Sequence, residues 1–135
     1  MNLVADASSA LGVVLPGHDP AVTQKFQDHL LLGDDIHVPS LWYLETLNVL
    51  LVRERRKKIT PAQRDEAISI LHGLPMLKDS ACADHIAHIQ QLGCRHSLSA
   101  YDACYLELAI RLAAPLLTAD DSLRSAAVAE GVPLL

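Results

Sequence analysis

The sequence predicts an α/β fold built on a parallel β-sheet. Short apolar runs alternate along the chain with helical stretches, which is the pattern of strands joined by crossover helices. Capping residues, prolines and glycines lie where the helical stretches begin and end. With 135 residues, of which 50% are hydrophobic, the chain is long enough to bury a proper core. We therefore expect a single domain over residues 1–135.

The N-terminal part is predicted to contain two strands and three helices. Its apolar runs are too short for helices and are followed by turn residues, whereas its longer stretches end at Gly17, Gly33 and a basic run. The predicted elements are a strand at 3–5, a helix from about 9 to 15, a helix at 20–31, a strand at 36–38 and a helix from Pro39 to about Lys57.

The C-terminal part begins with a strong helix start, in which Thr60 is the cap, Pro61 occupies the first turn and Gln63 completes a capping box. Later capping residues mark the remaining helices. The further elements are a strand at 75–78, a helix capped by Asp79 and ending near 93, a helix at 99–113, a strand at 115–118, a helix opened by Asp120 or Asp121, and a final apolar run after Gly131.

Composition and charge narrow the classes of protein. The net charge of −5 argues against non-specific nucleic-acid binding through overall charge. Polar residues interrupt every long apolar stretch, and the N-terminus has no basic region before an apolar one, so we expect neither a membrane span nor a secretory signal. The three cysteines form no CxxC pair, which favours a reducing, cytoplasmic setting.

Two acidic positions follow predicted strands. Asp6 comes directly after the first strand, and the pair Asp120–Asp121 follows the last strand after Thr118. The carboxyl ends of parallel strands are where ligand sites gather. The alternative is that each acid caps the next helix. A cap explains Asp6 and one member of the pair, but not readily both members.

Glu45 lies inside LWYLETLNVLLV, where leucines and valines cover nearly every face of the predicted helix. Burying a carboxylate without a partner would destabilise the fold by several kcal/mol, so Glu45 must lie on a polar strip of the helix surface or near a cation. Asn48, at i+3, lies on the same face and extends this polar strip. A glutamate that merely faces the surface is the alternative.

Asp102 follows Ser99 by three residues, which suits a first-turn acid favoured by the helix dipole. Glu107 lies five residues further on, on another face of the helix, and we leave it out of the site. If Asp6, Glu45, Asp102 and Asp120 converge, their mutual repulsion calls for a divalent cation. All-oxygen ligation suits Mg²⁺ or Mn²⁺ rather than zinc.

Four blocks of the sequence, in this order, resemble the PIN-domain ribonucleases, and most closely the VapC-type toxins of bacterial toxin–antitoxin pairs. The blocks are VADASSAL, VPSLWYLETLNVL, LSAYDACYLELA and LLTADDSLRSAAVAEGV, which span residues 4–132. The resemblance implies that Asp6, Glu45, Asp102 and Asp120 form the metal pocket and carry the catalysis. The accessory positions are Ser8, Asn48, Thr118 and Asp121.

The resemblance also implies a three-layer α/β/α sandwich and Mg²⁺- or Mn²⁺-dependent cleavage of single-stranded or loop RNA. Transfer RNA, ribosomal RNA and messenger RNA are all compatible, as targets, with one acidic pocket and one basic helix end. It implies a cognate VapB-type antitoxin and favours a homodimer. Asp6 and Asp102 are expected to hold the principal metal, with Glu45 and Asp120 completing its shell or positioning water.

Other features have two interpretations each. The basic run Arg53, Arg55, Arg56, Lys57 and Lys58 suits either a solvated helix C-terminus or contact with RNA phosphates. Trp42, Tyr43, Tyr101 and Tyr105 suit base stacking, although core packing is favoured for most of them. The cysteines and histidines of residues 82–96 lack zinc-site spacing, and the histidines are expected at the surface.

Three other functions compete with the nuclease. A phosphatase of the aspartate-nucleophile type requires a second acid where Ser8 stands, and a receiver domain requires a late-strand lysine that LLTADD lacks. Both are disfavoured. A non-catalytic PIN-like module that binds RNA or protein is the better alternative, since its acids would then serve only as caps.

Overall fold

A computed structural model describes residues 1–135, and its centre is a four-stranded parallel sheet with the order β3-β2-β1-β4. The strands are β1 (Asn2–Ala5), β2 (Asp35–Pro39), β3 (Leu77–Asp79) and β4 (Leu116–Leu117). Val4 of β1 is in register with His37 of β2 and with Leu116 of β4. Leu134 adds an isolated parallel bridge to Leu116. The predicted parallel α/β fold is confirmed.

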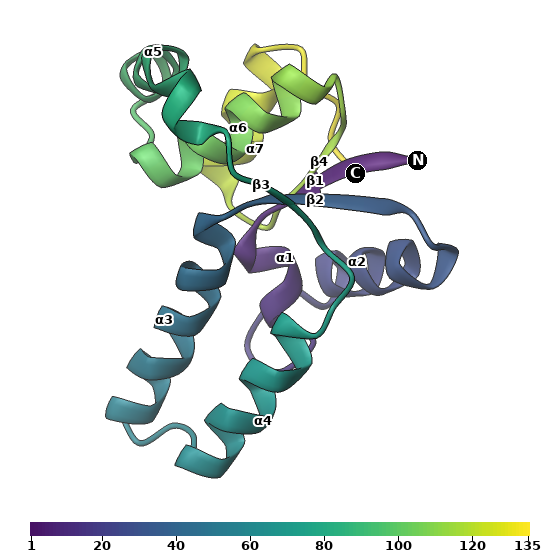
Figure 1. The fold of residues 1–135 in the computed structure, drawn as a ribbon, viewed down its shortest axis with the longest axis vertical. Coiled ribbons are helices and arrows are strands. Elements are labelled where there is room, and N and C mark those ends of the chain that lie inside the picture. The colour runs from purple at the N-terminus through teal and green to yellow at the C-terminus, as the bar shows by residue number, and fades with distance from the viewer.

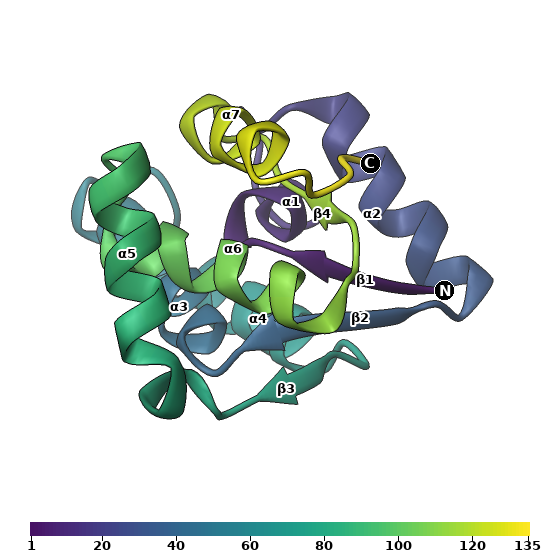
Figure 2. The same ribbon diagram turned by 90° about the horizontal axis from the view of Figure 1, so that it is seen from above.

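Helices cover both faces of the sheet (Figures 1 and 2). One side carries α1 (Ala7–Leu11), α2 (Pro20–Leu32), α3 (Leu41–Arg55) and α4 (Pro61–His72). The other carries the short 3-10 helix η1 (Cys82–His85), α5 (Ile86–His96), α6 (Ala100–Leu112) and α7 (Asp121–Ala129). Helices α3 and α4 pack side by side and extend away from the sheet in Figure 1. None of the helices has both the length and the apolar composition needed to cross a membrane.

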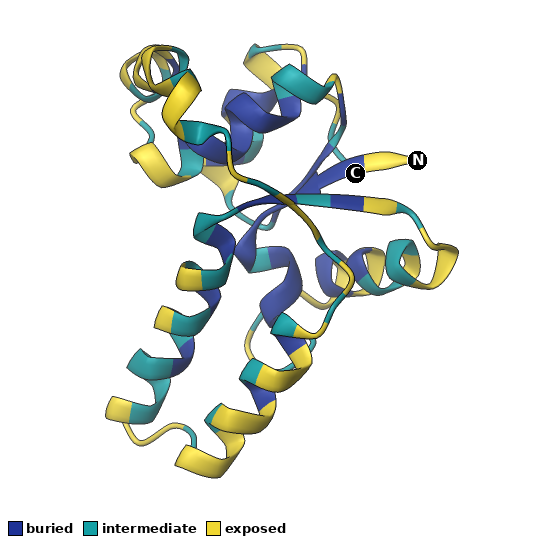
Figure 3. Ribbon diagram, in the orientation of Figure 1, coloured by how far each residue is buried: buried dark blue, intermediate teal, exposed yellow.

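A single cluster of 30 buried hydrophobic residues forms the core. In Figure 3 most of β1 and the middle of α6 are buried, whereas the far ends of α3 and α4 are largely exposed. Along α3 only Trp42, Thr46 and Leu50 are buried, and Leu44 is 70% exposed. Helix α3 is therefore less buried than its leucine-rich sequence predicts.

Several predicted boundaries were wrong, and two of them were wrong because a distant strand pairs with the segment. Helix α1 spans Ala7–Leu11 rather than residues from about 9 to 15, and Asp6 is its cap. Pro39 belongs to β2, and α3 begins only at Leu41, because Pro39 pairs with Asp79 of β3. Asp79 ends β3 and caps no helix; the region that follows forms η1 and then α5, which continues to His96. The capping box of α4 is present as predicted.

Candidate active site

The candidate site lies where β1 and β4 end. After β1 the chain builds β2 and β3 outward on one side, and it later returns to the other side of β1 as β4. This reversal is a topological switch point, the place in an open α/β sheet where ligand sites form. Asp6 follows β1 directly and Thr118 follows β4 directly, so both side chains enter this edge.

Asp6 is buried, with only 5% of its surface exposed. Its Oδ1 atom accepts hydrogen bonds from Ser8 Oγ (2.7 Å) and from the Ser9 backbone N–H (3.1 Å), and its Oδ2 atom accepts one from Thr118 Oγ1 (2.5 Å). Burial raises the pKa of Asp6 to about 6. The charge of Asp102 also raises this pKa, whereas the three hydrogen bonds favour the charged form and lower it. Asp6 is therefore both a helix cap and a buried acid of raised pKa.

The hydroxyls of Ser8 and Thr118 connect the two strand ends. Ser8 Oγ accepts the N–H of Ala119 (3.0 Å) and Thr118 Oγ1 accepts the N–H of Asp120 (3.0 Å), while both hydroxyls donate to Asp6. Only a group that both donates and accepts can bridge in this way. The two predicted accessory positions thus hold Asp6 in one orientation and fix the backbone that leads to Asp120.

Asp102 approaches the same edge from the first turn of α6, and Asp120 approaches it from the cap of α7. Ser99 caps α6 by accepting the N–H of Asp102 (3.1 Å), and Asp120 caps α7 by accepting the N–H of Leu123 (2.8 Å). Burial raises the pKa of Asp102, and the nearby charge of Asp120 raises it further. Asp121 lies exposed in the first turn of α7. Of the last pair, Asp120 is the acid whose charge acts on Asp102.

Glu45 reaches the group from α3 and is half-buried. Its Oε1 atom is enclosed and has no hydrogen-bond partner, and the hydroxyl of the buried Tyr105 on α6 also has none. Burial raises the pKa of Glu45, and the charges of Asp102 and Asp6 raise it further, while the nearby Tyr105 hydroxyl acts in the opposite direction. Glu45 and Asn48 line the same hollow of about 430 Å³, as their i+3 spacing predicts.

None of the four acids forms an ion pair with a lysine, arginine or histidine of the chain. They act on one another by charge, but no three His, Cys, Asp or Glu side chains lie close enough together to ligate one ion. Their chemistry nonetheless suits a hard divalent cation, because every donor is an oxygen and Glu45 Oε1 is unpartnered. Ligation by three or more of them requires the side chains to draw closer than they lie here.

The other predicted positions separate into surface and core. The basic residues 53–58 lie at the far end of α3 and just beyond it. Trp42 and Tyr105 are buried, Tyr43 packs edge-on against Trp42, and Tyr101 is 63% exposed. No zinc-like group forms among residues 82–96, and His85 lies instead 3.5 Å from a Glu107 oxygen.

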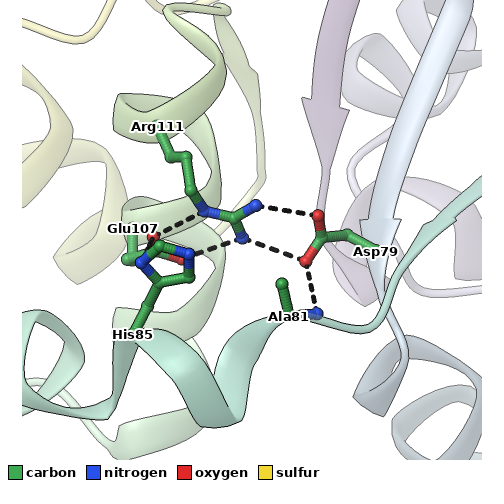
Figure 4. A network of polar contacts seen from close by, with 5 residues as sticks. All are labelled: Asp79, Ala81, His85, Glu107 and Arg111. Atoms are coloured by element: carbon green, nitrogen blue, oxygen red, sulfur yellow. Dashed lines mark hydrogen bonds and ion pairs between the residues drawn. The ribbon is translucent and has the colours of Figure 1, made fainter.

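Sequence reasoning missed a second carboxylate group, drawn in Figure 4. Arg111 of α6 donates to both oxygens of Asp79 (2.9 Å each) and to both oxygens of Glu107 (2.8 and 3.2 Å). Glu107 is only 1% exposed. The signal was an acid and an arginine at i and i+4 in an otherwise apolar helix, a spacing that places both on one face.

Comparison with known proteins agrees with this architecture. A family model, the PIN domain, matches residues 3–129. The crystal structure of PAE2754 from Pyrobaculum aerophilum is similar, with a TM-score of 0.67 and 20% sequence identity over 93% of this chain and 87% of that chain, and this likeness shows the fold. No curated protein matches. Because the family model spans nearly the whole chain, the protein belongs to the PIN domain family, whose members are generally nucleases.

Proposed function

We propose that this protein is a Mg²⁺- or Mn²⁺-dependent endoribonuclease and the toxin of a VapBC-type pair. The observation that carries the proposal is the state of the acids. Asp6, Glu45 and Asp102 all have a raised pKa, for which burial is the largest cause, and no cation of the chain balances their charge. A bound divalent cation would remove this electrostatic cost, and it is the group that a carboxylate nuclease requires.

In this proposal Asp6 and Asp102 hold the principal metal, and Glu45 and Asp120 complete its shell or position water. A bound metal would lower the pKa of the attacking water and stabilise the leaving oxygen. The chain supplies orientation: Ser8 and Thr118 fix Asp6, and the caps of α6 and α7 fix Asp102 and Asp120. The hollow beside Glu45 gives a substrate access to this edge.

The direct test is cleavage of RNA by wild-type protein with Mg²⁺ or Mn²⁺, with a chelator, and by Asp6→Asn. We expect chelation or the substitution to abolish cleavage while circular dichroism shows an unchanged fold. Asp28→Asn, on the exposed surface of α2, is the matched control and should cleave normally. Cleavage that survives both chelation and Asp6→Asn rules out the metal site.

A non-catalytic RNA- or protein-binding module is the second candidate, and one observation favours it. Asp6 and Asp120 each cap a helix, so each has a structural role that needs no metal. The same assay decides between the two, because a binding module would retain RNA without cutting it under any metal condition.

The toxin assignment extends the proposal to partners: a VapB-type antitoxin, a transfer or ribosomal RNA target, and a cytoplasmic homodimer. Its support is the resemblance of the four sequence blocks. Expression of the chain alone should arrest growth, and co-expression of the neighbouring reading frame should relieve the arrest. Sequencing the RNA ends produced during arrest would identify the target.

A further inference from the structure

The segment that follows β3 packs against one face of α6. Asp79, at the end of β3, is held by Arg111, and His85 of η1 lies 3.5 Å from a Glu107 oxygen (Figure 4). Cys104 precedes Glu107 by three residues and Arg111 by seven, so the three side chains project from the same face of the helix. The face of α6 that η1 contacts therefore includes Cys104.

Cys82, the first residue of η1, brings a second thiol to this face. Cys82 packs against the hydrophobic core that contains Cys104, and neither cysteine is bonded to another. Burial raises the pKa of Cys104 to about 12, and the neighbouring Cys82 thiol contributes to this rise. Packing and charge thus both place the two sulfur atoms next to each other, one on η1 and the other on α6.

The two thiols differ in their access to solvent. Cys104 is only 3% exposed, whereas Cys82 is partly exposed and is followed by the exposed residues Ala83 and Asp84. A small oxidant dissolved in water therefore reaches Cys82 first. The third cysteine, Cys94, is exposed on α5 and lines a hollow to which Cys82 and Cys104 do not contribute.

We propose that Cys82 and Cys104 form a reversible disulfide when the protein meets a peroxide. The Cys82 sulfur, after losing its proton, attacks one peroxide oxygen; the O–O bond breaks, and a sulfenic acid and one water molecule result. The Cys104 sulfur then attacks the Cys82 sulfur, the S–O bond breaks, and the departing hydroxide takes the Cys104 proton to form a second water. Two thiols are oxidised to one disulfide while one peroxide is reduced to two water molecules.

The disulfide would fasten η1 to the first half of α6. Cys104 follows Asp102 by two residues, and the acids must draw closer before three of them ligate one ion. A cross-link to η1 restrains this part of α6 and opposes that movement. This consequence, unlike the disulfide itself, rests on the proposed nuclease function. Oxidation should lower metal-dependent cleavage, and dithiothreitol should restore it.

The test starts from a Cys94→Ser protein, in which the exposed thiol cannot join two molecules. The folded protein is treated with hydrogen peroxide, the remaining thiols are alkylated, and peptides are analysed by mass spectrometry without a reductant. Cys82→Ser and Cys104→Ala are made in the same background. Alanine is used at the buried position because a serine hydroxyl there would lack a partner.

We expect both thiols of the Cys94→Ser protein to disappear together in one joined peptide pair, and dithiothreitol to restore both. The unfolding temperature should rise by about 10 °C on oxidation, because the bond restricts the unfolded chain across a loop of roughly 20 residues. Neither single-thiol variant should show this rise. In Cys104→Ala, oxidation should stop at the sulfenic acid of Cys82 before any slower oxidation.

Three outcomes overturn the inference. One is oxidation of Cys82 to the sulfinic acid in the Cys94→Ser protein with no joined peptides, which places Cys104 out of reach. The second is a bond that forms only in denaturant, which shows that the native fold keeps the thiols apart. The third is a bond that forms in the wild type but not in Cys94→Ser, which assigns it to the exposed cysteine.

Failure of the thiol pair and failure of the nuclease are distinguishable. If the disulfide forms but the reduced protein never cleaves RNA with Mg²⁺ or Mn²⁺, the thiol pair stands and the catalytic proposal fails. If the reduced protein cleaves RNA and no disulfide forms, the reverse holds. Equal cleavage by the oxidised and reduced forms overturns the restraint on α6.

Discussion

The acids around Asp6 and the acids around Arg111 are two carboxylate groups in one small protein, and they differ in what balances their charge. Asp79 has Arg111 within hydrogen-bonding distance, and this guanidinium lowers the pKa of Asp79. Asp6 has only hydroxyls and a backbone N–H around it, and burial raises its pKa to about 6. Helix α6 contributes to both groups, through Asp102 at its start and Glu107 further along.

The difference separates a structural group from a site that needs a ligand. Arg111 joins α6 to the end of β3 and gives both carboxylates of the second group a cationic partner (Figure 4). The first group is left with repulsion that the chain itself does not relieve. Buried acids of raised pKa that no cation of the chain balances are characteristic of functional sites rather than of stable cores. Four experiments test this contrast.

The largest effect is expected from Arg111→Met. It leaves Glu107 buried and without its cation, and breaking a buried ion pair on one side typically costs about 3–5 kcal/mol. Urea unfolding measures the loss. Arg64→Met is the control, because its ion pair with Glu54 is more exposed and should contribute about 1 kcal/mol or less. Equal losses from the two variants would contradict a special role for the Arg111 group.

The second experiment adds the missing cation. Mn²⁺ at 100 times its dissociation constant should stabilise the wild type by about 2.7 kcal/mol, measured as a rise in unfolding temperature. Asp120→Asn and Asp121→Asn form a matched pair, since asparagine can cap α7 as aspartate does. We expect the first to reduce the stabilisation and the second to retain it. The opposite order would move the fourth acid to Asp121.

The third experiment follows stability against pH without metal. The folded pKa of Asp6 rises from 3.8 to about 6, so its protonated form is favoured by folding and stability falls as pH rises from about 4 to 6. The full penalty is about 3 kcal/mol. Asp6→Asn should lack this fall and, after losing some hydrogen bonding, should be about 2 kcal/mol more stable than wild type at pH 7.

In the same pH titration, Asp79 changes the folding stability in the opposite direction to Asp6. Its folded pKa is lowered, so its contribution is present above pH 3.8 and is lost only as pH falls below that value. The two pH windows do not overlap. If the stability of the wild type does not change between pH 4 and 6, the conclusion that Asp6 carries an unbalanced buried charge is wrong.

The smallest effect concerns two atoms without a hydrogen-bond partner, Glu45 Oε1 on α3 and the Tyr105 hydroxyl on α6. Tyr105→Phe removes a hydroxyl that donates no hydrogen bond here but lies near the orphan Glu45 oxygen. If this hydroxyl orients Glu45 once a metal is bound, Mn²⁺ affinity should fall about tenfold, the size of an outer-shell effect. Isothermal titration measures it. The control is Tyr43→Phe, whose ring packs edge-on against Trp42 and does not line the hollow that contains Glu45, and this variant should bind Mn²⁺ normally.

Local sequence predicted local structure well. The capping box at Thr60, the Ser99 cap and the left-handed Gly33 were all readable because each depends only on residues within one turn. Predictions failed where a distant strand intervened. Pro39 and Asp79 were both assigned to helices, but each extends a strand by pairing with the other, which no local pattern reveals.

The sequence by itself determined the α/β class, the order of the elements and the identity of the acids at strand and helix ends, because periodicity and capping act over a few residues. Only the tertiary structure decided which charges meet. It brought Asp6 to Thr118 across 112 positions, let the charge of Asp120 act on Asp102, and gave Asp79 and Glu107 a shared arginine. Burial and charge depend on neighbours in space, and the sheet order sets those neighbours.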